Sequence, residues 1–103
     1  MLLPPQVRYM SLGNRPYEPI MRLRVRIAPR HRAAVRDDLV ARHAAMLEEH
    51  ERPSVCVMRA EAPLRKLLGY GEALSTLTDD TGLHWMWLDR YVPMNDPPGG
   101  RAA

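Results

Sequence analysis

Few side chains in this chain have a type and spacing that could support catalysis or metal binding. The four histidines, His31, His43, His50 and His84, form no metal-binding spacing such as H-x-x-x-H. Cys56 is the only cysteine, so no intramolecular disulfide can form, and a zinc site would lack the thiolates it commonly uses. The sequence therefore predicts neither a metal site nor a cofactor.

The nucleophiles and phosphate loops of common enzymes are also missing from the sequence. Cys56 lies within an apolar alternation, which is typical of an inert buried thiol. Ser54 and Ser75 have no His and Asp pattern around them. The pattern G-x-x-x-x-G-K-[ST] does not occur, so we expect no GTP binding by this chain in the P-loop manner. These observations predict a protein that is not an enzyme.

Arginine and tryptophan give a stronger signal, which is one of binding. Arg22, Arg24 and Arg26 alternate with apolar residues, and Trp85 and Trp87 do the same near the other end of the chain. Arginine suits phosphate recognition, whereas tryptophan and arginine together are also enriched at protein interfaces. The net charge of +3 permits an anionic partner without demanding one.

The elements that position these side chains follow from hydrophobic periodicity. The period-2 pattern of a half-buried strand is strict over residues 20–28, where arginines alternate with Met, Leu, Val and Ile. Three later segments have weaker strand patterns. The four predicted strands are residues 20–28, 46–52, 55–62 and 83–92.

Two helices are predicted to begin at Pro29 and Pro63, because proline is tolerated at the first helical position. The first helix has a narrow apolar stripe, with Arg42 among the arginines outside it. The second carries a leucine stripe from Leu64 to Leu77, and turn residues end it at 79–82.

The resulting order, βαββαβ, favours an α+β fold of the ferredoxin-like kind. Two helices of this length cover one face of a four-stranded antiparallel sheet and leave its other face open. Residues 18–92 would form this single domain. The irregular, proline-rich residues 1–17 are predicted to be a flexible leader, and residues 93–103 a disordered tail.

A series of short motifs within the predicted domain resembles the C-terminal domain (domain V) of elongation factor G and of related translational GTPases. The resemblance extends from about Glu18 to Tyr91. The motifs are Glu18-Pro19-Ile20-Met21, Ala62-Pro63-Leu64, Leu68-Gly69-Tyr70, then Leu74, Thr78 and Gly82, and finally Met86, Leu88 and Tyr91.

This resemblance implies the same ferredoxin-like fold and a place in translation. In the family, this domain lies near the GTPase-associated centre of the ribosome, its loops touch ribosomal RNA, and it is not the catalytic domain. One departure concerns the loop after the second helix, which in the family is usually basic. Here it is Asp79-Asp80-Thr81-Gly82, and an acidic pair repels phosphate.

The resemblance also assigns faces in the last strand. It implies that Met86 and Leu88 are in the core, and alternation then places His84 and Arg90 on the same side. The side chains expected to point outward are Trp85, Trp87, Asp89 and Tyr91, together with Arg22, Arg24, Arg26, Val55, Val57 and Arg59 from neighbouring strands.

Three interpretations of this open face remain. A basic and aromatic sheet can stack bases and bind RNA. The same composition suits a protein partner or a homodimer. Alternatively, arginine stems only cover the tryptophan rings. The candidate partner- or RNA-binding residues are Arg22, Arg24, Arg26, Arg59, Trp85 and Trp87.

We therefore expect a non-catalytic, stand-alone domain that binds the ribosome, ribosomal RNA or another translation component. The alternative is an interaction or regulatory module that self-associates through its open face. The chain has no run of apolar residues long enough to cross a membrane. With its single cysteine, this indicates a cytoplasmic protein.

Overall fold

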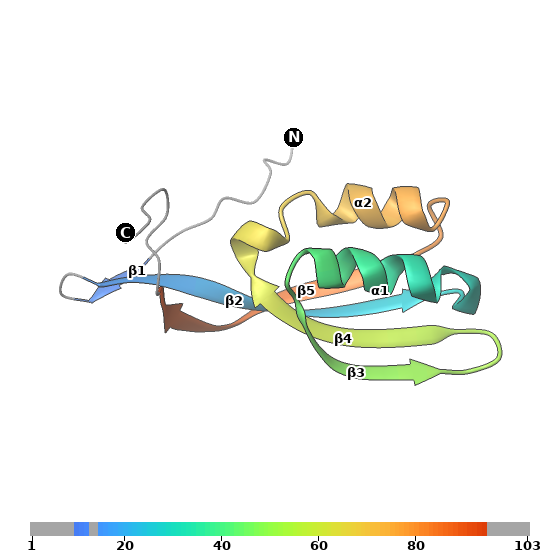
Figure 1. The fold of residues 1–103 in the computed structure, drawn as a ribbon, viewed down its shortest axis with the longest axis horizontal. Coiled ribbons are helices and arrows are strands. Elements are labelled where there is room, and N and C mark those ends of the chain that lie inside the picture. Colours follow the sequence, from blue (N-terminus) through green and yellow to red (C-terminus); the bar gives the residue numbers. More distant parts are fainter. Residues whose placement is uncertain (1–9, 13–14, 95–103) are drawn as a thin grey trace.

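One antiparallel sheet with both helices on one of its faces makes up the fold (Figure 1). The computed structural model describes residues 10–12 and 15–94. The elements in chain order are β1 (Met10–Leu12), β2 (Arg15–Ile27), the 3-10 turn η1 (Pro29–His31), α1 (Arg32–Ala41), β3 (Ala45–Glu51), β4 (Cys56–Pro63), the 3-10 turn η2 (Leu64–Lys66), α2 (Tyr70–Leu77) and β5 (Leu83–Pro93).

The long strand β2 lies at the centre of the sheet. It pairs with β4 on one side and with β5 on the other, and β3 extends the sheet beyond β4. The first predicted strand is thus flanked by the third and the fourth. This arrangement confirms the ferredoxin-like α+β fold predicted from the order of elements.

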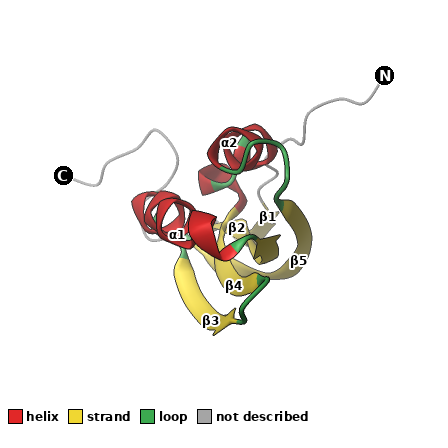
Figure 2. Ribbon diagram, turned by 90° about the vertical axis from the view of Figure 1, so that its right-hand side faces the viewer, coloured by secondary structure: helices red, strands yellow, loops and turns green. Residues whose placement is uncertain are grey.

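The core lies between the sheet and the two helices (Figure 2). Strand β2 contributes Leu23, Val25 and Ile27, all buried, while its arginines point to the opposite face. The alternation predicted for this strand is therefore confirmed. Cys56 is also fully buried in the core, and burial raises the pKa of its thiol, which disfavours the reactive thiolate.

The N-terminal segment differs from its prediction as a flexible leader. Strand β2 begins at Arg15, and its first residues form a hairpin with β1, with Met10 opposite Tyr17. Backbone pairing holds this hairpin, so the apolar periodicity used for prediction gives no sign of it. The other end also extends beyond the prediction, because β5 runs to Pro93 and Met94 is buried. Residues 1–9 and 95–103 lie outside the described residues.

The second predicted helix is interrupted. After η2 the chain turns at Gly69, which has a φ of 72°, and only Tyr70–Leu77 is α-helical. Glycine adopts a positive φ readily because it has no Cβ atom to clash with the backbone. The leucine stripe continues across this break, which is why its period predicted one helix from Leu64.

Arg42 follows the last residue of helix α1. The sequence predicts that it lies outside the apolar stripe, but its side chain makes several contacts within the fold. Its Nε donates to Asp38 at 3.0 Å, and its Nη1 donates to the carbonyl oxygens of Lys66 at 2.9 Å and Leu68 at 3.2 Å. Its guanidinium also lies 5.2 Å from the ring centre of Tyr70. Arg42 therefore ties the end of α1 to the turn that precedes α2.

Thr78 and Gly82 join the end of α2 to the start of β5. Thr78 is fully buried, and its Oγ1 donates to the Leu74 carbonyl at 2.7 Å and accepts from the Gly82 N–H at 2.8 Å. A Cβ atom on Gly82 would lie only 2.8 Å from this oxygen. The Leu74, Thr78 and Gly82 spacing seen in the sequence is thus one hydrogen-bonded unit.

We predict that Thr78→Val lowers the free energy of unfolding by about 1–3 kcal/mol, because the Gly82 N–H loses its acceptor while the side-chain volume is kept. Urea denaturation measures the change. Thr76→Val, at an exposed position of the same helix, is the matched control and should change stability by less than about 0.5 kcal/mol. Equal effects of the two substitutions would refute this role of Thr78.

Candidate interaction surface

The six predicted binding residues lie together on the sheet face that the helices leave open. We call this the outer face. In the strand register, Arg22 lies opposite Trp87, and Arg24 lies between Trp85 and Arg59. Directly opposed residues of antiparallel strands point to the same side of a sheet. The next row across the sheet consists of Leu83, Arg26, Val57 and His50.

Both tryptophans are substantially exposed on this face, at 43% each. The Arg24 guanidinium lies 4.9 Å from the ring centre of Trp85, within the range of a cation–π contact. Trp87 instead borders a small hollow with Arg22, Arg59 and Leu47. The arginine stems thus cover the rings only in part, and apolar ring surface remains for a partner.

An ion-pair network neutralises one part of the outer face. The Glu61 carboxylate accepts from Arg90 Nη1 at 2.7 Å and lies 3.5 Å from Arg22 Nε. The Asp89 carboxylate accepts from the same Arg90 nitrogen at 2.6 Å and is 3.8 Å from Arg22. Arg22 is therefore balanced by neighbouring carboxylates.

A β-bulge brings Asp89 and Arg90 to the same face. The β2–β5 register shifts between Ile20, opposite Arg90, and Met21, opposite Leu88, which leaves Asp89 as the extra residue. The expected inward position of Arg90 is thus wrong, since its guanidinium binds carboxylates on the outer face. After the bulge, alternation turns Tyr91 to the face opposite Arg90, in contrast to its predicted outward position.

Leu88 also departs from its predicted place in the core, being 49% exposed. It lies on the helix side of β5, opposite Met21, but β5 is an edge strand that the helices cover only partly. Met86 does pack against the core. The expected inward side of His84 agrees with its ring, which meets the buried Tyr70 edge to face at 5.7 Å.

The other part of the outer face carries positive charge that is only partly balanced by a carboxylate. Among the described residues, no carboxylate lies within 4.0 Å of Arg24, Arg26 or Arg52, and the nearest ion pair of Arg59 is with Glu48 at 3.9 Å. Arg24 and Arg59 are directly opposed across β2 and β4. Like charges in this arrangement destabilise a sheet, an effect that the Trp85 ring beside Arg24 and the Glu48 carboxylate beside Arg59 offset in part.

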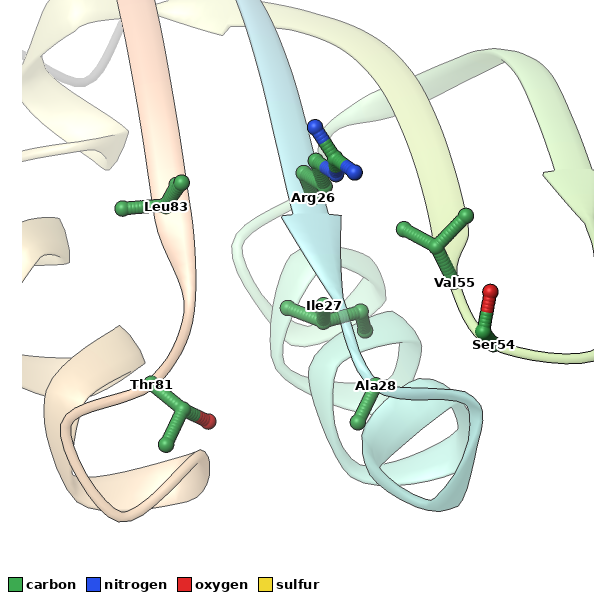
Figure 3. Close-up of a pocket in the computed structure, with 7 residues that line it drawn as sticks. All are labelled: Arg26, Ile27, Ala28, Ser54, Val55, Thr81 and Leu83. Carbon is green, nitrogen blue, oxygen red and sulfur yellow. The ribbon is translucent and has the colours of Figure 1, made fainter.

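Two shallow hollows border these arginines. One, on the β3–β4 side of the outer face, is lined by Arg24, Arg52, Arg59 and His50 together with Val57 and the acidic Glu48. The other lies at the end of the sheet, where Arg26, Ser54, Val55, Thr81 and Leu83 come from three separate segments (Figure 3). Two residues that border hollows were not among the predicted residues: Arg52 in the first of these hollows and Leu47 in the one beside Trp87. The sequence of β3 has no clear alternation, and its register with β4 shifts at Leu47, so periodicity could not assign side chains there to a face.

The described residues contain no group of three or more His, Cys, Asp or Glu side chains that could hold a metal ion. None of the helices described is both long and apolar enough to span a membrane. The outer face itself presents aromatic surface, exposed guanidinium groups and shallow hollows.

Comparison with known proteins identifies the family. Residues 15–101 match the family Elongation factor G C-terminus, so the chain belongs to that family. The chain is also 31% identical over 83 residues to the mitochondrial ribosome-releasing factor 2 of Danio rerio, covering 81% of this chain and 11% of that protein.

A solved structure supports the same assignment. The crystal structure of ttk003000868 from Thermus thermophilus superposes with a TM-score of 0.74 and 30% identity, covering 84% of this chain and 13% of that one. The chain thus spans about an eighth or less of the length of these relatives. The predicted resemblance is confirmed, as is the link to translation factors, while a cytoplasmic location stays a prediction.

The ion-pair network makes a testable prediction about pH. The hydrogen bond from Arg90 lowers the pKa of Glu61 below its usual range, against the opposing effect of desolvation. A lowered pKa in the folded state stabilises the fold above the unfolded-state pKa of about 4.3, and this contribution disappears as the pH falls through the lower, folded-state pKa.

We therefore expect Glu61→Gln to be less stable than the parent protein at pH 7, by at most about 1 kcal/mol because solvent screens the pair. Urea unfolding from pH 7 to pH 3 should show the two proteins converging at the acid end. A stability difference that stays constant with pH would exclude the ion pair as its source.

Proposed function

We propose that this chain is a non-catalytic binding module of the translation machinery that docks on the ribosome through its outer face. The observation that carries the proposal is the directly opposed pair Arg24 and Arg59, flanked by Arg26 and Arg52. Among the described residues, only Arg59 of these four has a carboxylate within 4.0 Å, that of Glu48 at 3.9 Å. An anionic surface would convert this unfavourable arrangement into a favourable one. The ribosome presents such a surface in its RNA.

The family relationship supports the choice of partner. The Danio rerio relative is named a ribosome-releasing factor, and the matched family is the C-terminus of an elongation factor. In this proposal, the arginines steer the domain toward its partner, and Trp85 and Trp87 provide the apolar contact that fixes its position. The exposed acidic turn at Asp79 and Asp80 lies outside the contact.

Co-sedimentation with ribosomes across a salt series tests the proposal. We predict saturable pelleting that weakens as salt rises, since charged contacts with RNA release counterions. The double variant Arg24→Gln/Arg26→Gln should bind about tenfold more weakly or worse, because two charge-assisted contacts together exceed 1.4 kcal/mol. No pelleting at low salt would reject the ribosome as the partner.

The matched control is Arg30→Gln/Arg36→Gln, which removes the same charge from the η1–α1 segment on the helix side. It should leave binding within about twofold, because only the general field changes. The variant Trp85→Ala/Trp87→Ala should abolish pelleting while keeping the circular dichroism of the folded domain. Retained binding by this variant would reject the assignment to the outer face.

Self-association through the outer face is the second candidate function, since the face carries both carboxylates and unpaired arginines. In that case, Arg59→Glu should change the oligomeric state of the isolated protein. A monomer that binds ribosomes would separate the two functions in favour of the first.

A further inference from the structure

The two edges of the sheet differ sharply in character. Edge strand β3 carries Glu48, Glu49, His50 and Glu51. Charged side chains of this kind protect an edge from pairing with another chain. Edge strand β5 has no such protection over Leu83–Leu88, where His84 is the only polar residue.

Exposed apolar side chains are concentrated on this unprotected strand. Of the eight large apolar residues exposed in the described part of the chain, five belong to β5. They are Leu83, Trp85, Trp87, Leu88 and Tyr91. A long, apolar, unblocked edge is a template for a further strand.

The backbone of β5 is also available for pairing. Among the described residues, β5 pairs with β2 alone. A groove beside it, lined by Leu64, Leu67, Tyr70, Gly71, His84 and Met86, leaves the helix side of the strand uncovered. The strand is regular from Leu83 to Leu88 and changes direction only at the bulge that follows.

We propose that the free edge of β5 pairs antiparallel with β5 of a second copy of this chain, forming a twofold-symmetric dimer with one continuous eight-stranded sheet made from β2 to β5 of each copy. The proposal concerns the edge of the sheet, so it does not depend on the ribosome-binding role of the outer face.

A second copy of β5 is the partner strand that we infer, because the strand is complementary to itself in an antiparallel pair. A twofold axis perpendicular to the sheet keeps the outer faces of both copies on the same side, so outward residues meet outward residues. Centring the axis on Met86 uses the regular stretch and stops short of the bulge. This register places Trp85 of each copy opposite Trp87 of the other, and Leu88 opposite His84.

The pairing is favourable for both faces of the sheet. Cross-strand aromatic pairs contribute about 0.2–1 kcal/mol each beyond the backbone hydrogen bonds. The paired stretch runs from His84 to Leu88. Charged Asp89 and Arg90 lie beyond it, where their ion pairs with Arg22 and Glu61 are kept within each copy. The outer faces of the two copies would become a single surface with four tryptophans.

Sedimentation equilibrium of the full 103-residue chain, from about 1 to 500 μM, tests the proposal. We expect a reversible monomer–dimer equilibrium. The variant Leu88→Lys, which places a lysine within the paired stretch of each copy, should weaken it at least about tenfold, because lysine protects an edge strand. Its matched control, Leu68→Lys, adds the same charge at a similarly exposed position outside the strand and should leave the dissociation constant within about twofold.

Two further measurements use the unmodified protein. Both tryptophans lie in β5, so their emission should shift to shorter wavelength as dimers form. Amide hydrogen exchange should slow with rising protein concentration within residues 84–88 and not within β3.

Three results would overturn the proposal. They are a monomer throughout the concentration range, equal weakening by Leu88→Lys and Leu68→Lys, or a dimer that Arg59→Glu abolishes and Leu88→Lys does not. The last result would instead indicate contact through the outer face. Ribosome pelleting by the edge variant separates this inference from the proposed function, which would survive the loss of the dimer.

Discussion

The alternation of strand β2 is the constraint on which the rest of the structure depends. As the central strand, it supplies Leu23, Val25 and Ile27 to the core from one face and three arginines to the outer face from the other. The register with β2 determines which side chains of β4 and β5 point to the core and which point to the outer face. A slip of one residue would turn three guanidinium groups toward the apolar core, where their desolvation is costly.

The two faces of the sheet therefore differ in the interactions that they make. The helix side is apolar and closed, with Arg42 and Thr78 making the hydrogen bonds that fix the ends of both helices. The outer face is divided instead, because carboxylates balance Arg22 but leave Arg24 and Arg26 without close counter-charges among the described residues. Packing of the core accounts for the first arrangement, and the second is the basis of the proposed binding role.

Sequence reasoning reached the fold because its signals were local and periodic, as in residues 20–28, and because the Pro, Gly and Thr motifs had fixed spacing. It placed six side chains on one face correctly for the same reason. It misplaced Arg90 and Tyr91 because a bulge breaks the two-residue period, and no residue type marks Asp89 as the extra one. It missed the β1–β2 hairpin and the contacts of Arg42, since both depend on backbone groups distant in the sequence.

The bulge at Asp89 also bears on how the length of this strand can change. Removing Asp89 would leave every other residue of β5 in its present register with β2, because the flanking pairs, Arg90 with Ile20 and Leu88 with Met21, would simply become adjacent. Removing any residue between Leu83 and Leu88 would instead turn part of the strand over and exchange tryptophan for methionine at the core. Single-residue deletions in β5 are therefore tolerable by the fold at the bulge and harmful within the regular stretch.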